Sequence, residues 1–236
     1  MFLHGLTRGA LSVEPLLSYL GDSWALDHIG HGASDRAPRY RVIDYAPPVI
    51  EWMSQNIQAP VLLYGHSLGS MVAPLVAAAL PGLVSHIVME DPPFSTMSTR
   101  LRESDWYPYF QSVAPLAGKW ISPEALGETS YQTLDGRTML YKDTRSPEML
   151  ARMAQFLGML DPKIFDDVLA GHWLDGYEWP GLQHPTLILQ ADPAKGGMLR
   201  DEDIPNGARV ERLNGVGHLA HWQAPERIHS ILKAWL

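Results

Sequence analysis

Short, continuous runs of apolar residues recur along the chain, and each run is followed by polar or acidic residues. Continuous apolar runs of this length are typical of strands that are buried on both faces of a parallel sheet. Segments with helical patterns lie between or after the runs, at residues 68–80 and 225–236. Alternating strands and helices predict an α/β fold whose ligands bind beyond the carboxyl ends of the strands. The clearest runs span residues 61–64, 86–89 and 185–189, and weaker runs span residues 24–26 and 208–213.

The alternation stops between residue 92 and about residue 183, where the chain becomes rich in Trp, Tyr, Met and Pro. Helical patterns persist there, at residues 147–160 and 162–170. We therefore interpret residues 92–183 as a helical cap that is inserted into an α/β core formed by residues 1–91 and 184–236. Most of the aromatic and methionine side chains of the cap are expected to pack it onto the core, and the others to line an apolar pocket.

The composition of the 236-residue chain argues against several kinds of partner, location and chemistry. Lys and Arg total 18 against 26 Asp and Glu, a formal net charge of −8 with no block of basic residues, which argues against a nucleic acid partner. The longest apolar stretch, residues 68–80, is too short to span a bilayer, so we expect no membrane segment. The absence of cysteine excludes disulfides and a cysteine nucleophile. The first residues have no signal-peptide pattern, so the expected location is cytoplasmic.

A candidate nucleophile lies between a predicted strand and a predicted helix. The sequence GHSLG at residues 65–69 fits the pattern G-x-S-x-G, with Ser67 at its centre. A strand that delivers the serine into a tight turn, and a helix that leaves it, are what this motif needs to expose the hydroxyl group. The alternative is a serine in an ordinary glycine-rich turn.

A serine nucleophile also needs a base, and His218, which follows a late strand, is the best placed of the ten histidines. The weaker candidates are His66, His221 and His229.

The chain resembles the α/β-hydrolase fold superfamily, in the form of a serine hydrolase with a helical cap, and the matching motifs run nearly from end to end. The resemblance implies an oxyanion hole formed by the backbone N–H groups of Leu6 and Leu68. It also implies two strands before the first strand of this chain, for which the sequence has no residues, so we expect a sheet of about six strands. The motifs are His4-Gly5, DHIGHGASD at residues 27–35, GHSLG at residues 65–69 and Val216-Gly217-His218.

Three residues are candidates for the acid that would orient His218. Many relatives carry G-x-x-D after the strand at residues 187–190, but here alanines stand at the Gly and Asp places, and Asp192 comes two positions early. Some branches take the acid from the end of the preceding strand, where Asp91 lies, and we favour Asp91. Strand alternation points Glu90 to the other face of the sheet. All three obey the chain order serine, acid, histidine, although an Asp before Pro is often only a turn cap.

These residues predict a serine hydrolase that cleaves a small to medium apolar carboxylic ester or lactone through an acyl-enzyme. Two alternatives stay open: a C–C bond hydrolase that uses the same triad, and a non-catalytic ligand-binding protein on the same scaffold. No cofactor and no metal are expected, because the sequence has neither G-x-G-x-x-G after a strand nor a His/Asp/Glu cluster with metal-ligand spacing. The expected partner is a small-molecule substrate, and a homodimer is allowed.

Overall fold

A six-stranded parallel sheet forms the centre of the molecule. The structure is a computed structural model, and it describes residues 1–236 except for the side chains of residues 99 and 100. The strand order is β2-β1-β3-β4-β7-β8, and every neighbouring pair is parallel. This arrangement confirms the predicted α/β class and the predicted number of strands. The strands are β1 (Phe2–Leu3), β2 (Ala25–Leu26), β3 (Val61–His66), β4 (Val84–Glu90), β7 (Thr186–Ala191) and β8 (Arg209–Leu213).

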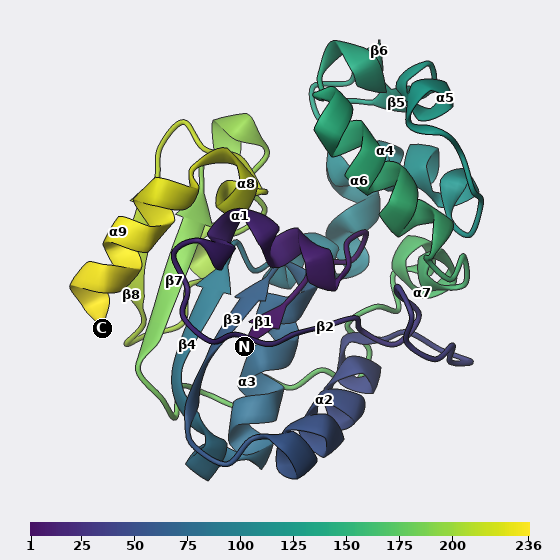
Figure 1. The fold of residues 1–236 in the computed structure, drawn as a ribbon. Helices are drawn as coiled ribbons and strands as arrows, with labels where there is room; N and C mark the ends of the chain where they lie inside the picture. The colour runs from purple at the N-terminus through teal and green to yellow at the C-terminus, as the bar shows by residue number, and fades with distance from the viewer.

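Helices cover both faces of this sheet. Successive side chains of a strand point to opposite faces, so a continuous apolar strand gives each face apolar side chains that a helix can bury. Leu63 and Met89 belong to one buried apolar cluster, whereas their neighbours Tyr64 and Val88 belong to a second. The first cluster includes residues of two helices on one face, and the second includes residues of three helices on the other face (Figure 1). The first two are α2 (Val42–Asn56) and α3 (Leu68–Ala79); the other three are α1 (Glu14–Leu17), α8 (Ala220–Gln223) and α9 (Pro225–Trp235).

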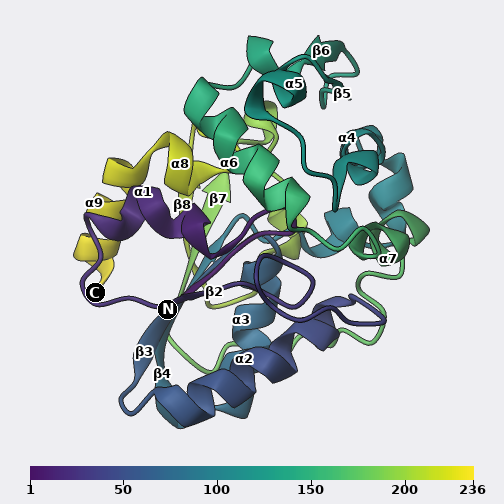
Figure 2. The same ribbon diagram turned by 45° about the vertical axis from the view of Figure 1, so that its right-hand side comes forward.

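The segment between β4 and β7 forms a separate group of elements that does not join the central sheet (Figure 2). Its longest helix begins where Ser146 accepts a hydrogen bond from the N–H of Met149, at 3.2 Å, and where Pro147 takes the first helical position. An antiparallel pair of strands, which the sequence patterns did not predict, lies among the helices. The elements are α4 (Trp106–Val113), α5 (Pro123–Gly127), β5 (Ser130–Gln132), β6 (Thr138–Leu140), α6 (Pro147–Gly158) and α7 (Ile164–Ala170).

Most large side chains of this segment pack inward. The same apolar cluster that contains residues of helices α2 and α3 also contains four buried rings of this segment, those of Phe110, Tyr141, Phe165 and Trp173.

Among the described residues, none of the helices combines the length and the apolar character that a bilayer crossing needs.

Candidate active site

Ser67 lies at the sharp turn between β3 and α3. Its backbone φ is 51°, in the left-handed region that residues other than glycine rarely adopt. The two flanking glycines permit the turn by close backbone approach: a Cβ atom on Gly65 would overlap the carbonyl of Gly69, and one on Gly69 would overlap the carbonyl of Leu3. The N–H of Ser67 donates to the carbonyl of Glu90 at 2.9 Å, which ties the turn to β4. Ser67 therefore has the strand–turn–helix setting that the sequence motif predicts.

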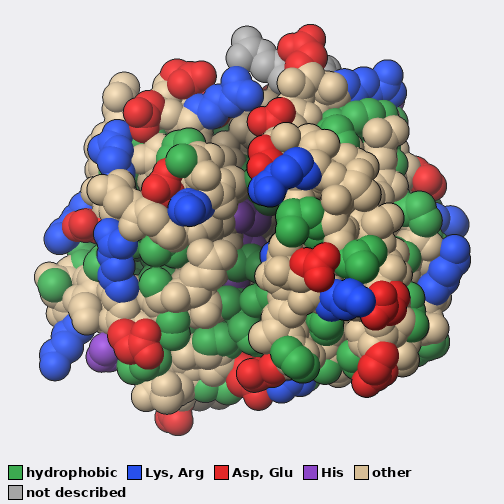
Figure 3. Space-filling model, turned by 90° about the horizontal axis from the view of Figure 1, so that it is seen from above, with side chains coloured by type: hydrophobic (Ala, Val, Ile, Leu, Met, Phe, Trp, Pro, Cys, Tyr) green, Lys and Arg blue, Asp and Glu red, His purple; other side chains and the backbone are tan. Residues whose placement is uncertain are grey.

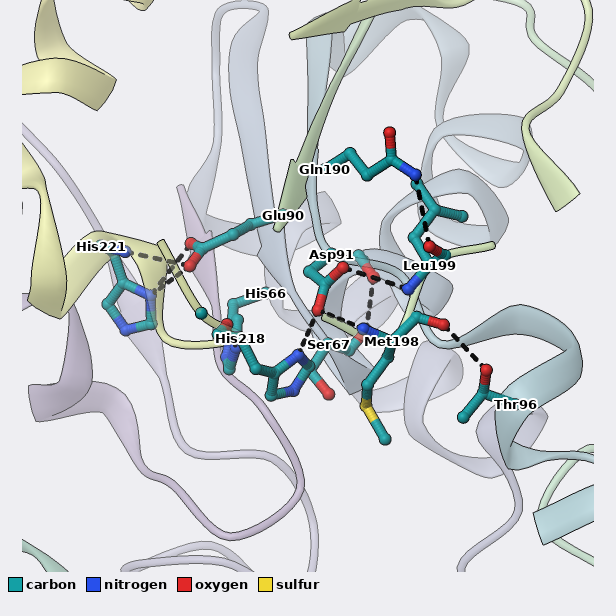
Figure 4. A network of polar contacts seen from close by, with 12 residues as sticks. His66, Ser67, Glu90, Asp91, Thr96, Gln190, Met198, Leu199, His218 and His221 are labelled. Atoms are coloured by element: carbon teal, nitrogen blue, oxygen red, sulfur yellow. Dashed lines mark hydrogen bonds and ion pairs between the residues drawn. The ribbon is translucent and has the colours of Figure 1, made fainter. Parts of the chain in front are cut away.

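Asp91 directly follows β4, and its carboxylate contacts His218. Its Oδ2 lies 2.6 Å from Nδ1 of His218, and the backbone N–H groups of Met198 and Leu199 donate to the carboxylate at 2.8 and 3.1 Å. Asp91 is fully buried. Ser67 and His218 line one cavity, and Figure 4 shows the Ser67 side chain next to the His218 ring, with Asp91 on another side of that ring. The three residues thus meet at the carboxyl ends of the strands.

Asp192 has different partners. Its Oδ1 accepts a hydrogen bond from the N–H of Ala194 at 2.9 Å, and its Oδ2 accepts one from the N–H of Gly215 at 2.7 Å. These two hydrogen bonds lower the pKa of Asp192 below its usual value. The carboxylate closes the turn that ends β7 and ties it to the loop before His218, which is the role of a turn cap. Of the three candidate acids, only Asp91 contacts His218 among the described residues.

The backbone N–H groups of Leu6 and Leu68 lie near Ser67, and neither has a hydrogen-bond acceptor among the described residues. Leu6 follows the His4-Gly5 turn, and Leu68 is the first residue of α3. Nδ1 of His4 lies 2.8 Å from the carbonyl of Gly5, which belongs to the same peptide unit as the N–H of Leu6. Because the C=O and N–H of a trans peptide point in opposite directions, this contact fixes the direction of the Leu6 N–H.

The protonation of His4 follows from its contacts. Burial lowers the pKa of His4 well below its usual value, and the neighbouring His28 and His31 lower it further. Nε2 of His4 accepts a hydrogen bond from the backbone N–H of His28 at 3.0 Å. The proton of the neutral ring is therefore on Nδ1, which donates to the carbonyl of Gly5. The sequence singled out the His4-Gly5 turn, but it gave no signal for this supporting role of the imidazole.

A cavity of about 220 Å³ opens over Ser67, and a hollow with histidine at its floor is visible at the centre of the face in Figure 3. Aromatic side chains from α4 and β5 form part of its wall, and three basic side chains also line it. None of the described residues that line it is acidic. The aromatic residues are Trp106, Tyr109, Phe110 and Tyr131; the basic ones are Arg8, Arg145 and Lys195.

A second acid–histidine pair lies behind the first. The carboxylate of Glu90 contacts Nδ1 of His221 at 2.8 Å, and it accepts hydrogen bonds from the N–H of His221 at 3.0 Å and the hydroxyl of Tyr64 at 2.7 Å. Burial alone would raise the pKa of Glu90, but the neighbouring His221 and His66 and the hydrogen bonds from His221 and Tyr64 outweigh it and lower the pKa to about 2. Figure 4 shows this pair beside Asp91 and His218.

His66, Glu90 and His221 together form a buried group of a kind that could hold a metal ion. Spacing along the sequence does not reveal this group, because His221 is far from the other two. Both Glu90 oxygens already interact with His221 or Tyr64, and Nε2 of His66 lies 2.9 Å from the carbonyl of His218. Nδ1 of His66 and Nε2 of His221 are buried without a hydrogen-bond partner among the described residues, so an ion would compete with existing contacts at the carboxylate and not at these two nitrogens. We interpret the group as a hydrogen-bonded support for the His218 loop.

Comparisons with known proteins show which sequences and folds this chain is similar to. The model of the "Alpha/beta hydrolase family" matches residues 1–231. A 2-(acetamidomethylene)succinate hydrolase of Mesorhizobium japonicum is 30% identical over 154 residues, which cover 58% of this chain and 55% of that protein. Lipase LipV of Mycobacterium tuberculosis is 30% identical over 103 residues, covering 43% and 40%. The chain thus spans about half the length of the curated relatives that it matches.

Solved structures show the same fold over the whole chain. The structure described as "Est816 as an N-Acyl homoserine lactone degrading enzyme" has a TM-score of 0.67 and covers 100% of this chain and 92% of its own. Its sequence identity of 20% supports a shared fold alone.

Proposed function

The chain belongs to the alpha/beta hydrolase family of enzymes, and on that premise we propose that it is a serine hydrolase that cleaves a carboxylic ester or lactone of small to medium size. The observation that carries this proposal is the contact of 2.6 Å between Asp91 and His218 at the cavity that Ser67 also lines. Relatives named as a hydrolase and a lipase support hydrolysis of an acyl compound. A serine, a base and an acid that orients the base are the requirements for nucleophilic catalysis by a hydroxyl group.

In the proposed mechanism, Oγ of Ser67 attacks the carbonyl carbon of the substrate while Nε2 of His218 takes the hydroxyl proton. The Asp91 carboxylate holds Nδ1–H of His218 and stabilises the imidazolium. The tetrahedral intermediate collapses to an acyl-enzyme, and His218 gives the proton to the leaving alcohol. Water then attacks the acyl-enzyme with His218 again as base, which releases the carboxylic acid and restores Ser67.

The N–H groups of Leu6 and Leu68 would hold the oxyanion of that intermediate. Both are without an acceptor among the described residues, so they can donate to the substrate without breaking an existing bond. One such donor is typically worth about 3 kcal/mol of transition-state stabilisation. His4 is the positioning residue in this arrangement, because it fixes the peptide unit that carries the Leu6 N–H.

We extend the proposal to residues 92–183, which would act as a cap over Ser67. Helix α4 and strand β5 of this segment contribute Trp106, Tyr109, Phe110 and Tyr131 to the cavity wall. These rings would contact the apolar part of the substrate and shield it from bulk solvent.

Labelling with a fluorophosphonate, followed by intact mass measurement, tests the mechanism. We expect one adduct on the wild-type protein, no adduct on Ser67→Ala, and normal labelling of Ser12→Ala. Ser12 is a matched control because its hydroxyl is also buried but donates to the carbonyl of Gly9, away from the cavity. A folded wild-type protein that is not labelled would refute the serine-hydrolase mechanism.

A further inference from the structure

Two arginines that line the cavity, Arg8 and Arg145, have no acidic partner within the described part of the chain. Among the described residues, neither Arg8 nor Arg145 forms an ion pair, although several other arginines do. Among the described residues, the guanidinium of Arg8 has one hydrogen bond, to the carbonyl of Thr7 at 3.4 Å, and that of Arg145 has one, to the carbonyl of Thr144 at 3.0 Å. A guanidinium group has several N–H donors in a planar fork, so most of the donors of both side chains are unused.

The two guanidinium groups line the same cavity as Ser67, and they are close enough for their charges to interact. Both side chains are partly buried. Burial lowers the pKa of Arg8, and the like charge of Arg145 lowers it too. The hydroxyl of Tyr141 is buried without a hydrogen-bond partner in the part of the chain that the structure describes, and it interacts electrostatically with both arginines. Two like charges in a partly desolvated place cost free energy unless a negative charge joins them.

We propose, as an addition that rests on the serine-hydrolase function above, that Arg8 and Arg145 bind a free carboxylate of the substrate. The preferred substrate is then an ester or lactone whose acyl group also carries a carboxylate, such as a half-ester of a short dicarboxylic acid. Arginine forks match carboxylates in a bidentate manner, and no acidic side chain among those described lines the cavity to compete with the substrate. The exposed Lys195 adds a third positive charge to the lining.

The charge of the whole chain makes this cavity distinctive. The formal net charge is −8, yet every charged side chain that lines the cavity at neutral pH is basic. The positive charges that line the cavity attract small anions, although the protein as a whole is acidic. The ring of Tyr131 lies 5.6 Å from the Arg145 guanidinium and helps to hold it in place.

A binding experiment tests the anion site without catalysis. Succinate is titrated into Ser67→Ala by calorimetry, and the titration is repeated with Ser67→Ala/Arg145→Gln and Ser67→Ala/Arg137→Gln. We expect succinate to bind, Arg145→Gln to weaken binding by about 10-fold to 100-fold, and Arg137→Gln to leave it unchanged. Arg137 is a matched control because it is exposed and pairs with Asp135. Binding that is absent, or that ignores Arg145, would overturn the inference.

A kinetic experiment compares two esters of similar shape, monoethyl succinate and ethyl 4-methylpentanoate, by titration of the released acid. We expect wild type to prefer the half-ester, and Arg145→Gln to lower kcat/KM for the half-ester about 10-fold or more while changing the neutral ester by less than about threefold. If Arg145→Gln does not fold, Arg8→Gln serves in its place. An equal fall for both esters, or a wild-type preference for the neutral ester, would refute carboxylate recognition.

The two proposals fail in different ways. If Ser67 is labelled but succinate does not bind, the anion site is wrong and the serine hydrolase remains. If succinate binds through Arg145 but Ser67 is not labelled, the anion site remains and the hydrolase mechanism is wrong.

Discussion

Asp91 and Asp192 each follow a buried strand, but their carboxylates have different hydrogen-bond partners. We expect Asp91→Asn to lower kcat roughly a thousandfold to ten-thousandfold, because an amide would favour the wrong tautomer of His218. Asp192→Asn should keep kcat within about twofold and lower thermal stability slightly, because it weakens only a turn. Steady-state kinetics on one ester, with melting curves for both variants, separates these roles. Similar kcat losses in the two variants would contradict the assignment.

The sequence favoured Asp91 among these acids but could not exclude the other two. Sequence spacing placed Asp91, Asp192 and Glu90 near the same edge of the sheet, but which carboxylate reaches His218 depends on how the chain turns after each strand. Asp91 has a φ of 45°, a conformation that no local sequence signal indicates for an aspartate before two prolines. Arg8 and Arg145 were missed for a similar reason, because they line the same cavity only through the fold of residues 92–183.

At the scale of the elements, the contact between α3 and β1 depends on one glycine. A Cβ atom on Gly69 would overlap the carbonyl and the side chain of Leu3, so Gly69→Ala must push the start of α3 away from β1. We expect a loss of about 2 kcal/mol or more in unfolding free energy and much slower labelling of Ser67, because overpacking moves the turn that carries the nucleophile. Urea unfolding and labelling rates measure the two effects.

Gly82→Ala is the matched control for this substitution. Gly82 lies shortly after α3, and a Cβ atom there would meet nothing within 4 Å. We expect its stability and labelling rate to match those of the wild type. If Gly69→Ala were as stable and as reactive as Gly82→Ala, close packing of α3 on β1 would not control the position of Ser67.

The long central strands were predictable because each is a continuous apolar run that ends in polar residues. Strands β3, β4 and β7 lie within two residues of the predicted runs at 61–64, 86–89 and 185–189. The hairpin of β5 and β6 was missed because each strand has only three residues, too few to show alternation. Its one available signal was the Asp135-Gly136 pair between the strands, a dipeptide that is common in hairpin turns.

At the scale of the whole molecule, buried neutral histidines make folding sensitive to mild acid. Burial lowers the pKa values of His4, His28, His31 and His66, and that of His28 falls to about 3. The unfolded chain binds protons at these rings near the usual histidine pKa of about 6.5. Above that pH their contribution to stability is complete, and it is lost as the pH falls towards the lowered pKa values, because only the unfolded state gains protons. Unfolding free energy should therefore decline below about pH 6.5.

His28 allows this effect to be measured for a single ring. Both of its ring nitrogens are buried without hydrogen-bond partners among the described residues, and its hydrogen bond with His4 uses only the backbone N–H, which His28→Phe retains. Between about pH 7 and pH 5.5, the unfolding free energy of His28→Phe should fall by about 1 kcal/mol less than that of the wild type, since one proton-binding site is gone from the unfolded chain. Urea unfolding at several pH values measures the difference. His229→Phe, on the partly exposed side of α9, should keep the wild-type slope. Parallel curves for wild type and His28→Phe would mean that His28 takes up its proton equally well in the folded molecule, and that the buried ring is not a source of acid sensitivity.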